Sequence, residues 1–332
     1  MPDMRRESSF SVESWLDYRG CADLNRCIVD NLSKVPRDVD AVVGIPRSGM
    51  LAACLLALHL NLPLTDLDGL FQGRFPSGGD RAKHGAKDRI EHVLVMDDDV
   101  KTGAALAATR KLITEANLGY RYTFAVAYAS QGQAHLADVV FEIVEGAQRI
   151  FEWKMMNNGM LGSVCFDMDG VLCRDALPEE DDDGDQYRRF LEHAEPKFRP
   201  ARKIGWIISS RIEKYRKLTE QWLSRHGIEY GELILMDYPS KEERNRADPS
   251  RFKAQVYSDK PSWLFVESNP IHAMNISRWS GKPVYCVDDS RMYYPEEFHV
   301  ARGKLKRRLT SLPQSLKRFM IERANSLLRK IS

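Results

Sequence analysis

The sequence predicts an α/β protein of two domains, each an open and mostly parallel sheet with helices on both faces. Its 332 residues exceed the usual size of one domain. Short apolar runs of strand length alternate with helical patterns along the chain. Asn157, Asn158 and Gly159 interrupt that alternation. We therefore expect domains at residues 1–156 and 160–295, followed by a tail at 300–332.

Composition indicates a soluble protein of a reducing compartment. Hydrophobic residues make up 43% and charged residues 29%, which is ordinary for a globular chain. The six cysteines are scattered without a Cys-x-x-Cys pair, so we expect neither disulfides nor structural zinc. The segment Met1–Phe10 lacks the apolar core of a signal peptide. The longest apolar run, Met50–Leu60, is too short to span a bilayer, and we predict a cytoplasmic protein.

The elements of the first domain follow from apolar spacing. Val12–Leu32 has near-helical spacing and predicts one or two helices. Met50–Leu60 predicts another helix, and Arg149–Met156 closes the domain. Four further runs predict strands besides the one discussed next: Val39–Ile45, Leu64–Leu70, Tyr122–Ala129 and Val139–Val144.

One stretch combines carboxylates with a small-residue loop. Val93–Met96 predicts a buried strand, and Asp97, Asp98 and Asp99 follow it. A Thr-Gly loop then leads into a helix predicted over Ala104–Glu115, whose free backbone N–H groups suit a phosphate. Carboxylates suit a sugar diol or a hydrated Mg²⁺. The order of strand, acid pair, Thr-Gly loop and helix therefore predicts a ribose 5-phosphate site. The alternative is a strand that ends in an acidic helix start, with an aspartate or threonine as cap.

This stretch resembles the 5-phosphoribosyl-1-pyrophosphate (PRPP) signature of type I phosphoribosyltransferases. The resemblance implies that the acid pair holds the ribose hydroxyls and the loop holds the 5-phosphate, through Asp97, Asp98, Lys101, Thr102 and Gly103. The chain departs from the signature at two positions. Asp99 stands where an apolar residue is more frequent, and Ala105 stands where many members carry Thr or Ser.

Two other segments of the first domain gain a role from this resemblance. Arg47, Ser48 and Gly49 follow a predicted strand, where the family binds pyrophosphate. Arg47 would supply charge, and the next two residues would supply backbone donors; a plain turn is the alternative. Residues 71–89 are rich in glycine and basic residues. They predict either a solvated loop or the family's mobile loop that closes over pyrophosphate.

A second acidic motif opens the next domain. Ser163–Leu172 predicts a buried strand that ends in Asp-x-Asp-Gly, and residues i and i+2 of a strand point the same way. Asp167 and Asp169 could therefore share one metal or phosphate. Two more apolar strands follow, each ending in a polar residue, at Ser209 and Glu267, and Lys253 lies between them.

These four segments resemble, in order, the motifs of haloacid dehalogenase (HAD) superfamily phosphatases. The resemblance implies that Asp167 is the nucleophile and Asp169 the general acid/base. Ser209 would be the hydroxyl residue of the second motif, and Lys253 would steady the charge of the nucleophile and the phosphate. Mg²⁺ would be held by Asp167, the backbone carbonyl of Asp169 and Glu267. Ser268 departs from the pattern, because many members carry a second acid there.

Two segments lie outside these motifs. Residues 175–200 contain the acidic run Glu179–Asp185, which we expect to be a solvated loop, and one helix at Gln186–His193. This is too little for a full cap domain, so the phosphatase site should be open and suit a bulky substrate. The tail contains ten basic residues and one acid after residue 300, with apolar residues at helical spacing. It predicts a basic amphipathic helix that lies on an anionic membrane or packs across the domains.

Together the two halves predict a sequential enzyme. The first domain would transfer 5-phosphoribosyl from PRPP to an acceptor, and the second would remove the 5-phosphate. This combination resembles bifunctional systems that install ribofuranose in bacterial surface polysaccharides. It implies a lipid-linked glycan acceptor at the inner membrane face. Asp66 and Asp68 are candidates for the acceptor base by chain position alone.

Two alternatives remain open from the sequence. One is a nucleobase phosphoribosyltransferase fused to a nucleotidase, and the other is a PRPP-sensing regulatory protein. No nucleic-acid partner is expected, because the tail lacks aromatic interleaving. The sequence leaves a homo-oligomer open.

Overall fold

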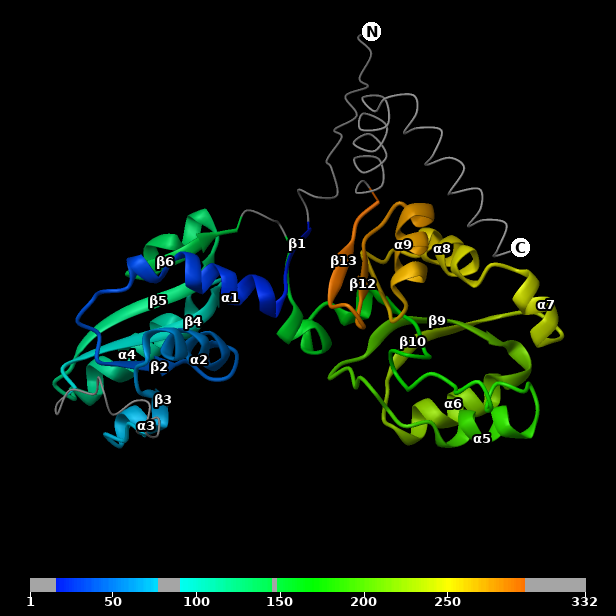
Figure 1. The fold of residues 1–332 in the computed structure, drawn as a ribbon, viewed down its shortest axis with the longest axis horizontal. Helices are drawn as coiled ribbons and strands as arrows, with labels where there is room; N and C mark the ends of the chain where they lie inside the picture. Colours follow the sequence, from blue (N-terminus) through cyan, green and yellow to red (C-terminus); the bar gives the residue numbers. More distant parts are fainter. Residues whose placement is uncertain (1–15, 77–89, 145–147, 296–332) are drawn as a thin grey trace, which may run out of the picture. The chain divides into compact units, whose positions relative to one another are not determined.

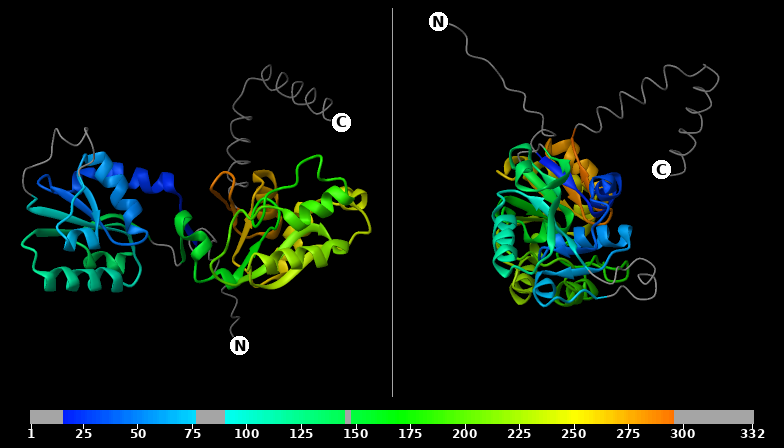
Figure 2. Two further views of the ribbon diagram at one scale, coloured as in Figure 1. Left: turned by 90° about the horizontal axis from the view of Figure 1, so that it is seen from below. Right: turned by 90° about the vertical axis from the view of Figure 1, so that its left-hand side faces the viewer.

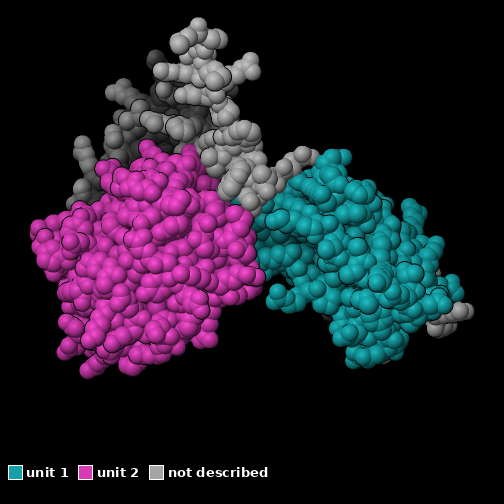
Figure 3. Space-filling view, turned by 180° about the vertical axis from the view of Figure 1, so that it is seen from behind, with its two compact units in different colours: residues 1–156 teal, residues 157–332 magenta. Residues whose placement is uncertain are grey.

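The computed structural model describes residues 16–76, 90–144 and 148–295, and the chain divides into two compact units at residues 1–156 and 157–332 (Figure 1, Figure 3). The basic tail and residues 77–89 of the glycine-rich loop lie outside the described residues. Within the described ranges, no helix combines the length and apolarity needed to cross a membrane.

Unit 1 is built on a five-stranded sheet in which all neighbouring strands are parallel. Its order is β3-β2-β4-β5-β6. β2 and the first half of β4 are buried on both faces, which explains their continuous apolar sequences. The strands are β2 (Ala41–Gly44), β3 (Leu64–Asp66), β4 (His92–Val100), β5 (Arg121–Ala129) and β6 (Val139–Ile143).

Helices cover both faces of this sheet (Figure 2). On one face, α1 (Cys21–Asp30) and α2 (Gly49–Leu60) form a hydrophobic core with the even-numbered residues at the start of β4. On the other face, α3 (Leu67–Phe71) and α4 (Ala104–Ala116) pack against the odd-numbered residues. Short 3₁₀ helices complete the unit at η2 (Leu32–Lys34), η4 (Gln131–Leu136) and η5 (Glu152–Asn157).

Three expectations for unit 1 are wrong at the level of secondary structure. Part of the segment expected to be helical is β1 (Leu16–Arg19), which pairs in parallel with β7 (Gln148–Phe151). The strand expected over Leu64–Leu70 ends at Asp66, because the Asp66 carboxylate accepts the Gly69 N–H at 2.7 Å and caps α3. β4 does not stop at Met96; it continues through the three aspartates.

Unit 2 contains a six-stranded sheet of order β10-β9-β8-β11-β12-β13. Its strands are parallel except for the antiparallel pair β12 and β13. The strands are β8 (Val164–Phe166), β9 (Ile204–Ile212), β10 (Tyr230–Met236), β11 (Leu264–Glu267), β12 (Val284–Cys286) and β13 (Arg291–Tyr293). Both units are therefore α/β, as the alternation of apolar patterns predicts.

The helices of unit 2 lie on both sides of its sheet (Figure 1). α8 (Pro249–Asp259) and α9 (Pro270–Ser280) share one hydrophobic core with the central strands. α5 (Asp185–His193) and α6 (Arg216–Arg225) lie on the other side, where they contact each other. The remaining helices are α7 (Lys241–Arg246), η6 (Leu161–Ser163) and η7 (Glu213–Tyr215).

Each sheet reverses its strand order near its centre. β2 pairs with β3 on one side and with β4 on the other. β8 likewise pairs with β9 on one side and with β11 on the other. In open parallel sheets, ligands bind beyond the carboxyl ends of the strands at such a reversal. The topology therefore points to the β2–β4 edge in unit 1 and to the β8–β11 edge in unit 2.

Candidate functional sites

The three aspartates of unit 1 lie in the last part of β4. β5 pairs with β4 as far as Val100 and keeps that backbone extended. Side chains alternate across a strand, so Asp98 points to the opposite face from Asp97 and Asp99. The side chains of Asp97 and Asp98 are buried. The acid pair of the PRPP signature therefore does not project from a loop.

Residues that follow β6 in the chain provide partners for two of these acids. The indole Nε1–H of Trp153 donates to Asp98 Oδ2 at 2.7 Å, and Lys154 Nζ lies 2.7 Å from the same oxygen. Arg149 forms an ion pair with Asp99 and donates to the Val100 carbonyl at 3.2 Å. The sequence analysis gave none of these partners a role, because about fifty residues separate them from the acids.

The charge state of the acids differs along the strand. Burial, reinforced by the neighbouring Asp98 carboxylate, raises the pKa of Asp97 to about 7. Burial also raises the pKa of Asp99 to about 6, although the Arg149 guanidinium opposes the shift. One Asp97 oxygen accepts the Asp98 N–H at 2.9 Å. Among the described residues, Asp98 and Asp99 each have an ion-pair partner and Asp97 has none.

The structure brings the loop after β2 against Asp97. The Ile45 N–H donates to the Met96 carbonyl at 3.0 Å and joins the ends of the two strands. A Cβ atom at Gly49 would lie 2.8 Å from Asp97 Oδ1 and 2.9 Å from the Met96 carbonyl oxygen. Only glycine permits this approach. Arg47 is exposed, Ser48 is half-buried, and the peptide bond between Pro46 and Arg47 is cis.

The second predicted loop connects β4 to α4. Lys101 and Thr102 are exposed, and Thr102 Oγ1 accepts the Ala104 N–H at 3.4 Å. Gly103 has a φ of +80°, and a Cβ there would collide with Leu136. The first turn of α4 follows at once, so its free N–H groups can bind an anion. The helix begins at Ala104, where the sequence predicts it.

The two candidates for an acceptor base differ in availability. The Asp66 carboxylate is engaged in capping α3. The Asp68 side chain is exposed in the first turn of the same helix. Asp68 is therefore the better placed of the two to meet an external hydroxyl.

Unit 2 brings three of its predicted site residues into direct contact. Asp167 follows β8, Glu267 ends β11, and Lys253 projects from α8. Lys253 Nζ lies 2.6 Å from Asp167 Oδ2 and 2.8 Å from Glu267 Oε2. All three side chains are buried. Residues more than eighty positions apart thus form one cluster at the strand-order reversal of the sheet.

This cluster holds two carboxylates against one ammonium. Burial, together with the Glu267 carboxylate, raises the pKa of Asp167 well above its ordinary value. Burial alone would also raise the pKa of Glu267, but Lys253 outweighs it and lowers that pKa. Burial acts against the Lys253 charge, yet the two acids raise its pKa. Two buried carboxyl groups therefore share one ammonium, and a bound cation would favour the ionised form of both.

The donor set suits Mg²⁺. Among the described residues, no three His, Cys, Asp or Glu side chains are placed to hold a metal ion. The candidate ligands are instead two carboxylates, from Asp167 and Glu267, and the backbone carbonyl of Asp169. Mg²⁺ prefers hard oxygen ligands and keeps several of its water ligands. Two protein carboxylates are therefore a suitable ligand set for it. Ser268 follows Glu267 directly and donates its hydroxyl to the Asp169 carbonyl at 3.4 Å.

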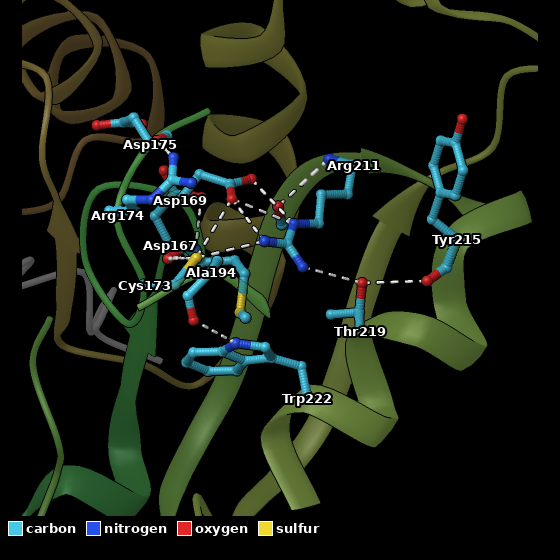
Figure 4. Close-up of polar contacts among 12 residues, drawn as sticks. Asp167, Asp169, Cys173, Arg174, Asp175, Ala194, Arg211, Tyr215, Thr219 and Trp222 are labelled. Atoms are coloured by element: carbon cyan, nitrogen blue, oxygen red, sulfur yellow. Dashed lines mark hydrogen bonds and ion pairs between the residues drawn. The ribbon is translucent and has the colours of Figure 1, made fainter. Parts of the chain in front are cut away.

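The remaining predicted residues of unit 2 lie beside an arginine that the sequence analysis overlooked. Arg211 forms an ion pair with the Asp169 carboxylate at 2.6 Å (Figure 4). Ser209 is fully buried, and its Oγ accepts the Arg211 backbone N–H at 3.2 Å. The signal was present in the sequence, since Arg211 ends the same strand segment as Ser209. Its contact with Asp169 forms only because β8 and β9 are neighbouring strands.

The acidic run of unit 2 is not a freely solvated loop, and that expectation is wrong. Glu180 pairs with Arg174, and Asp181 pairs with Lys241. Asp183 pairs with Lys214 and accepts the Tyr215 hydroxyl at 2.6 Å. Asp182 accepts backbone N–H groups at the start of α5. The four acids Glu180–Asp183 therefore have partners, which lie in the same loop and near the starts of α5, α6 and α7.

Three kinds of comparison with known proteins gave different results. No protein-family model matches the chain. No curated protein matches it either.

Three solved structures are similar to about two-fifths of the chain. A xanthine-guanine-hypoxanthine phosphoribosyltransferase from Helicobacter pylori has 17% identity and a TM-score of 0.33; the match covers 42% of this chain and 92% of that one. A purine phosphoribosyltransferase from Pyrococcus horikoshii has 17% identity and a TM-score of 0.31, with coverages of 42% and 93%. An orotate phosphoribosyltransferase from Aeropyrum pernix has 21% identity and a TM-score of 0.24, with coverages of 39% and 69%.

Proposed function

We propose that unit 1 transfers 5-phosphoribosyl from PRPP to an acceptor, and that unit 2 then hydrolyses the 5-phosphate. The observation that carries the proposal is the contact between two loops at the carboxyl ends of β2 and β4. There the Pro46–Gly49 loop lies against Asp97, and the start of α4 follows the same strand. An anion-binding helix end, a glycine loop and a carboxylate are the groups that a phosphorylated sugar requires.

Different residues of unit 1 would bind different groups of PRPP. Lys101, Thr102 and Gly103 with the first turn of α4 would hold the 5-phosphate. Asp97 would accept hydrogen bonds from the ribose hydroxyls, while Asp98 positions Lys154 beside them. Arg47 and the N–H groups of the following loop would hold the pyrophosphate that departs. Mg²⁺, when bound with PRPP, supplies the positive charge that stabilises this leaving group.

Unit 2 would act on the product of that transfer. An Asp167 oxygen forms a bond to phosphorus as the bond from phosphorus to the ribose oxygen breaks, and Asp169 gives its proton to the leaving oxygen. Water then loses a proton to Asp169 and attacks phosphorus, and the bond to Asp167 breaks to release phosphate. Lys253 stabilises the charge on Asp167, which it already contacts.

The acceptor we favour is a lipid-linked glycan at the cytoplasmic face of the inner membrane. Between β8 and β9 the only α-helix of the described residues is the nine-residue α5, so little chain is available to enclose a small substrate. An open phosphatase site suits a phosphoribosyl group carried on a larger molecule. The final product would be a β-ribofuranosyl residue.

Incubation with PRPP and Mg²⁺, with either a glycolipid acceptor or free nucleobases, tests this proposal. We expect release of pyrophosphate and inorganic phosphate with the glycolipid. Nucleotide formation without a glycan product would instead favour a nucleobase transferase fused to a nucleotidase. Binding of PRPP without turnover of any acceptor would favour a regulatory protein.

Two variants separate the proposed steps. Asp167→Asn should accumulate a phosphorylated glycan, because the first step remains intact. Asp97→Ala combined with Asp98→Ala should give no product with the same acceptor. Release of an unphosphorylated ribofuranosyl product by Asp167→Asn would show that the hydrolase assignment is wrong.

A further inference from the structure

Arg211 lies at the end of β9 with its guanidinium aimed at Asp169 (Figure 4). Nε lies 3.0 Å and 3.2 Å from the two Asp169 carboxylate oxygens, and Nη2 lies 2.6 Å from Oδ1. Nη2 also lies 3.3 Å from Cys173 Sγ, and Nη1 donates to Thr219 Oγ1 at 3.2 Å. Each of the three nitrogens thus has at least one partner, and two of the three nitrogens contact the same carboxylate.

The surroundings of Arg211 hold this geometry rigidly. The Cys173 thiol is also 3.4 Å from Asp169 Oδ1, so it braces the carboxylate from a second direction. Thr219 donates its hydroxyl to the Tyr215 carbonyl at 3.1 Å. The guanidinium carbon lies 5.7 Å from the centre of the Phe190 ring. The arginine can therefore neither rotate away nor exchange donors without loss of several contacts.

Stability alone gives a poor reason to bury this arginine. Arg211 is only 1% exposed, and removing a guanidinium from water costs several kcal/mol before its partners repay it. An apolar side chain of similar volume would often be equally stable at such a position. The ion pair instead fixes the orientation of Asp169, whose carboxylate is 24% exposed. The Arg211 side chain is thus fixed in the core, and the Asp169 carboxyl group reaches the proposed site.

We propose that Arg211 is a positioning residue that holds the Asp169 carboxyl group where, once it is protonated, it can give its proton to the oxygen that leaves phosphorus. This inference rests on the proposed hydrolase function of unit 2. The planar fork of arginine is suited to the task, because two parallel contacts fix the carboxylate plane and a lysine ammonium cannot. Arg211 itself does not touch the substrate.

The leaving group distinguishes this role from a merely structural one. An alkyl oxygen, as in ribose 5-phosphate, leaves as an unstable alkoxide and requires the proton of Asp169. An aryl oxygen, as in p-nitrophenyl phosphate, leaves as a stabilised anion and requires it much less. Misplacement of Asp169 should therefore slow hydrolysis of the alkyl ester more than that of the aryl ester. General distortion of the site should slow both equally.

The experiment measures kcat and KM of the full chain with both esters and Mg²⁺ for Arg211→Met, Arg211→Lys and the control Arg216→Met. Arg216 pairs with Glu213 and Glu220, away from Asp169. We expect both Arg211 variants to lose at least ten times more kcat on ribose 5-phosphate than on p-nitrophenyl phosphate. KM should change little, and the control should resemble the wild type. If Arg211→Met does not fold, Arg211→Lys gives the result, because it retains the buried cation without the fork.

The outcomes separate this inference from the function on which it rests. Equal loss on both esters, or a change confined to KM, would overturn the positioning role while the hydrolase function stands. Failure of the wild type to hydrolyse either ester would overturn both. A crystal structure of Arg211→Met provides a readout without activity: Asp169 should occupy more than one rotamer. A single, unchanged rotamer would contradict the proposal.

Discussion

The two units place acidic side chains at the same point of their sheets but compensate them differently. In unit 1, Asp97, Asp98 and Asp99 follow one another on a single strand and meet Arg149 and Lys154. In unit 2, the acids Asp167, Asp169 and Glu267 come from two segments and meet Lys253 and Arg211. In both described sites, three carboxylates therefore face two cations.

The difference lies in the burial of the cations. The contrast rests on one cation of unit 1, because Lys154 remains 36% exposed, whereas the side chains of Arg149, Lys253 and Arg211 are 9%, 2% and 1% exposed. An exposed lysine can reorient when a charged ligand arrives, but a buried one cannot leave its partners. Lys154 is therefore the one cation of the four that has room to move, and we expect a ligand of unit 1 to displace it more readily than a ligand of unit 2 displaces Lys253.

The largest effect is expected from Lys253→Met. It leaves two carboxylates buried without their shared cation, which should destabilise unit 2 by about 3–5 kcal/mol. Lys154→Met is the matched control in unit 1 and should cost much less, because the lysine is partly exposed and Trp153 still donates to Asp98. Hydrogen exchange of peptides from each unit measures both losses. Equal losses would show that cation burial does not separate the two sites.

The second prediction concerns the pH dependence of unit 1. The pKa of Asp97 is about 7 in the folded chain against an ordinary 3.8. Between these values the folded state binds more protons than the unfolded chain, so stability falls as pH rises from about 4 to about 7.

Asp97→Asn should remove this group's share of that slope, which is at most about 1.4 kcal/mol per pH unit. Exchange-derived unfolding free energies of unit 1 between pH 4 and pH 8, about the window in which Asp97 titrates, measure the change. An unaltered slope in the variant would contradict the charge assignment.

The third prediction tests the approach of the two loops. Gly49→Ala places a Cβ 2.8 Å from Asp97 Oδ1 and should cost about 1–3 kcal/mol as the loop moves away from β4. PRPP affinity, measured by calorimetry, should fall with it. Gly132→Ala is the control, because a Cβ there meets no atom within 4 Å. If Gly49→Ala binds PRPP with wild-type affinity, the close approach of this loop to Asp97 does not contribute to PRPP binding.

The smallest effect is expected from Trp153→Phe. The variant keeps the stack on Phe151, whose ring centre lies 5.0 Å away, but loses the N–H that donates to Asp98. One buried hydrogen bond contributes about 0.5–1.5 kcal/mol, and the thermal midpoint of unit 1 should fall accordingly. Trp279→Phe in unit 2, at a ring that is partly exposed, controls for the substitution itself. An effect no larger than that of the control would mean that Lys154 alone holds Asp98.

Local pattern was sufficient for most of the elements. The helix from Ala104, the buried run of β2 and the strand that precedes Asp167 lie where apolar spacing places them. These elements depend on residues within a few positions of one another. Pattern failed for β1, because its partner β7 begins about 130 residues later and overrides the helical spacing.

The candidate sites likewise contain residues that local sequence indicates and residues that only the fold brings together. Sequence alone singles out Asp97 and Asp167 as candidates, because each is the first acid after an apolar run. It could not reveal that Lys154, Trp153 and Arg211 would meet these acids. Such pairings depend on which strands and helices become neighbours, and charges become strongly coupled only when folding brings them within a few ångströms in a medium that excludes water. Tertiary structure therefore decided which carboxylate is compensated and which remains for a ligand.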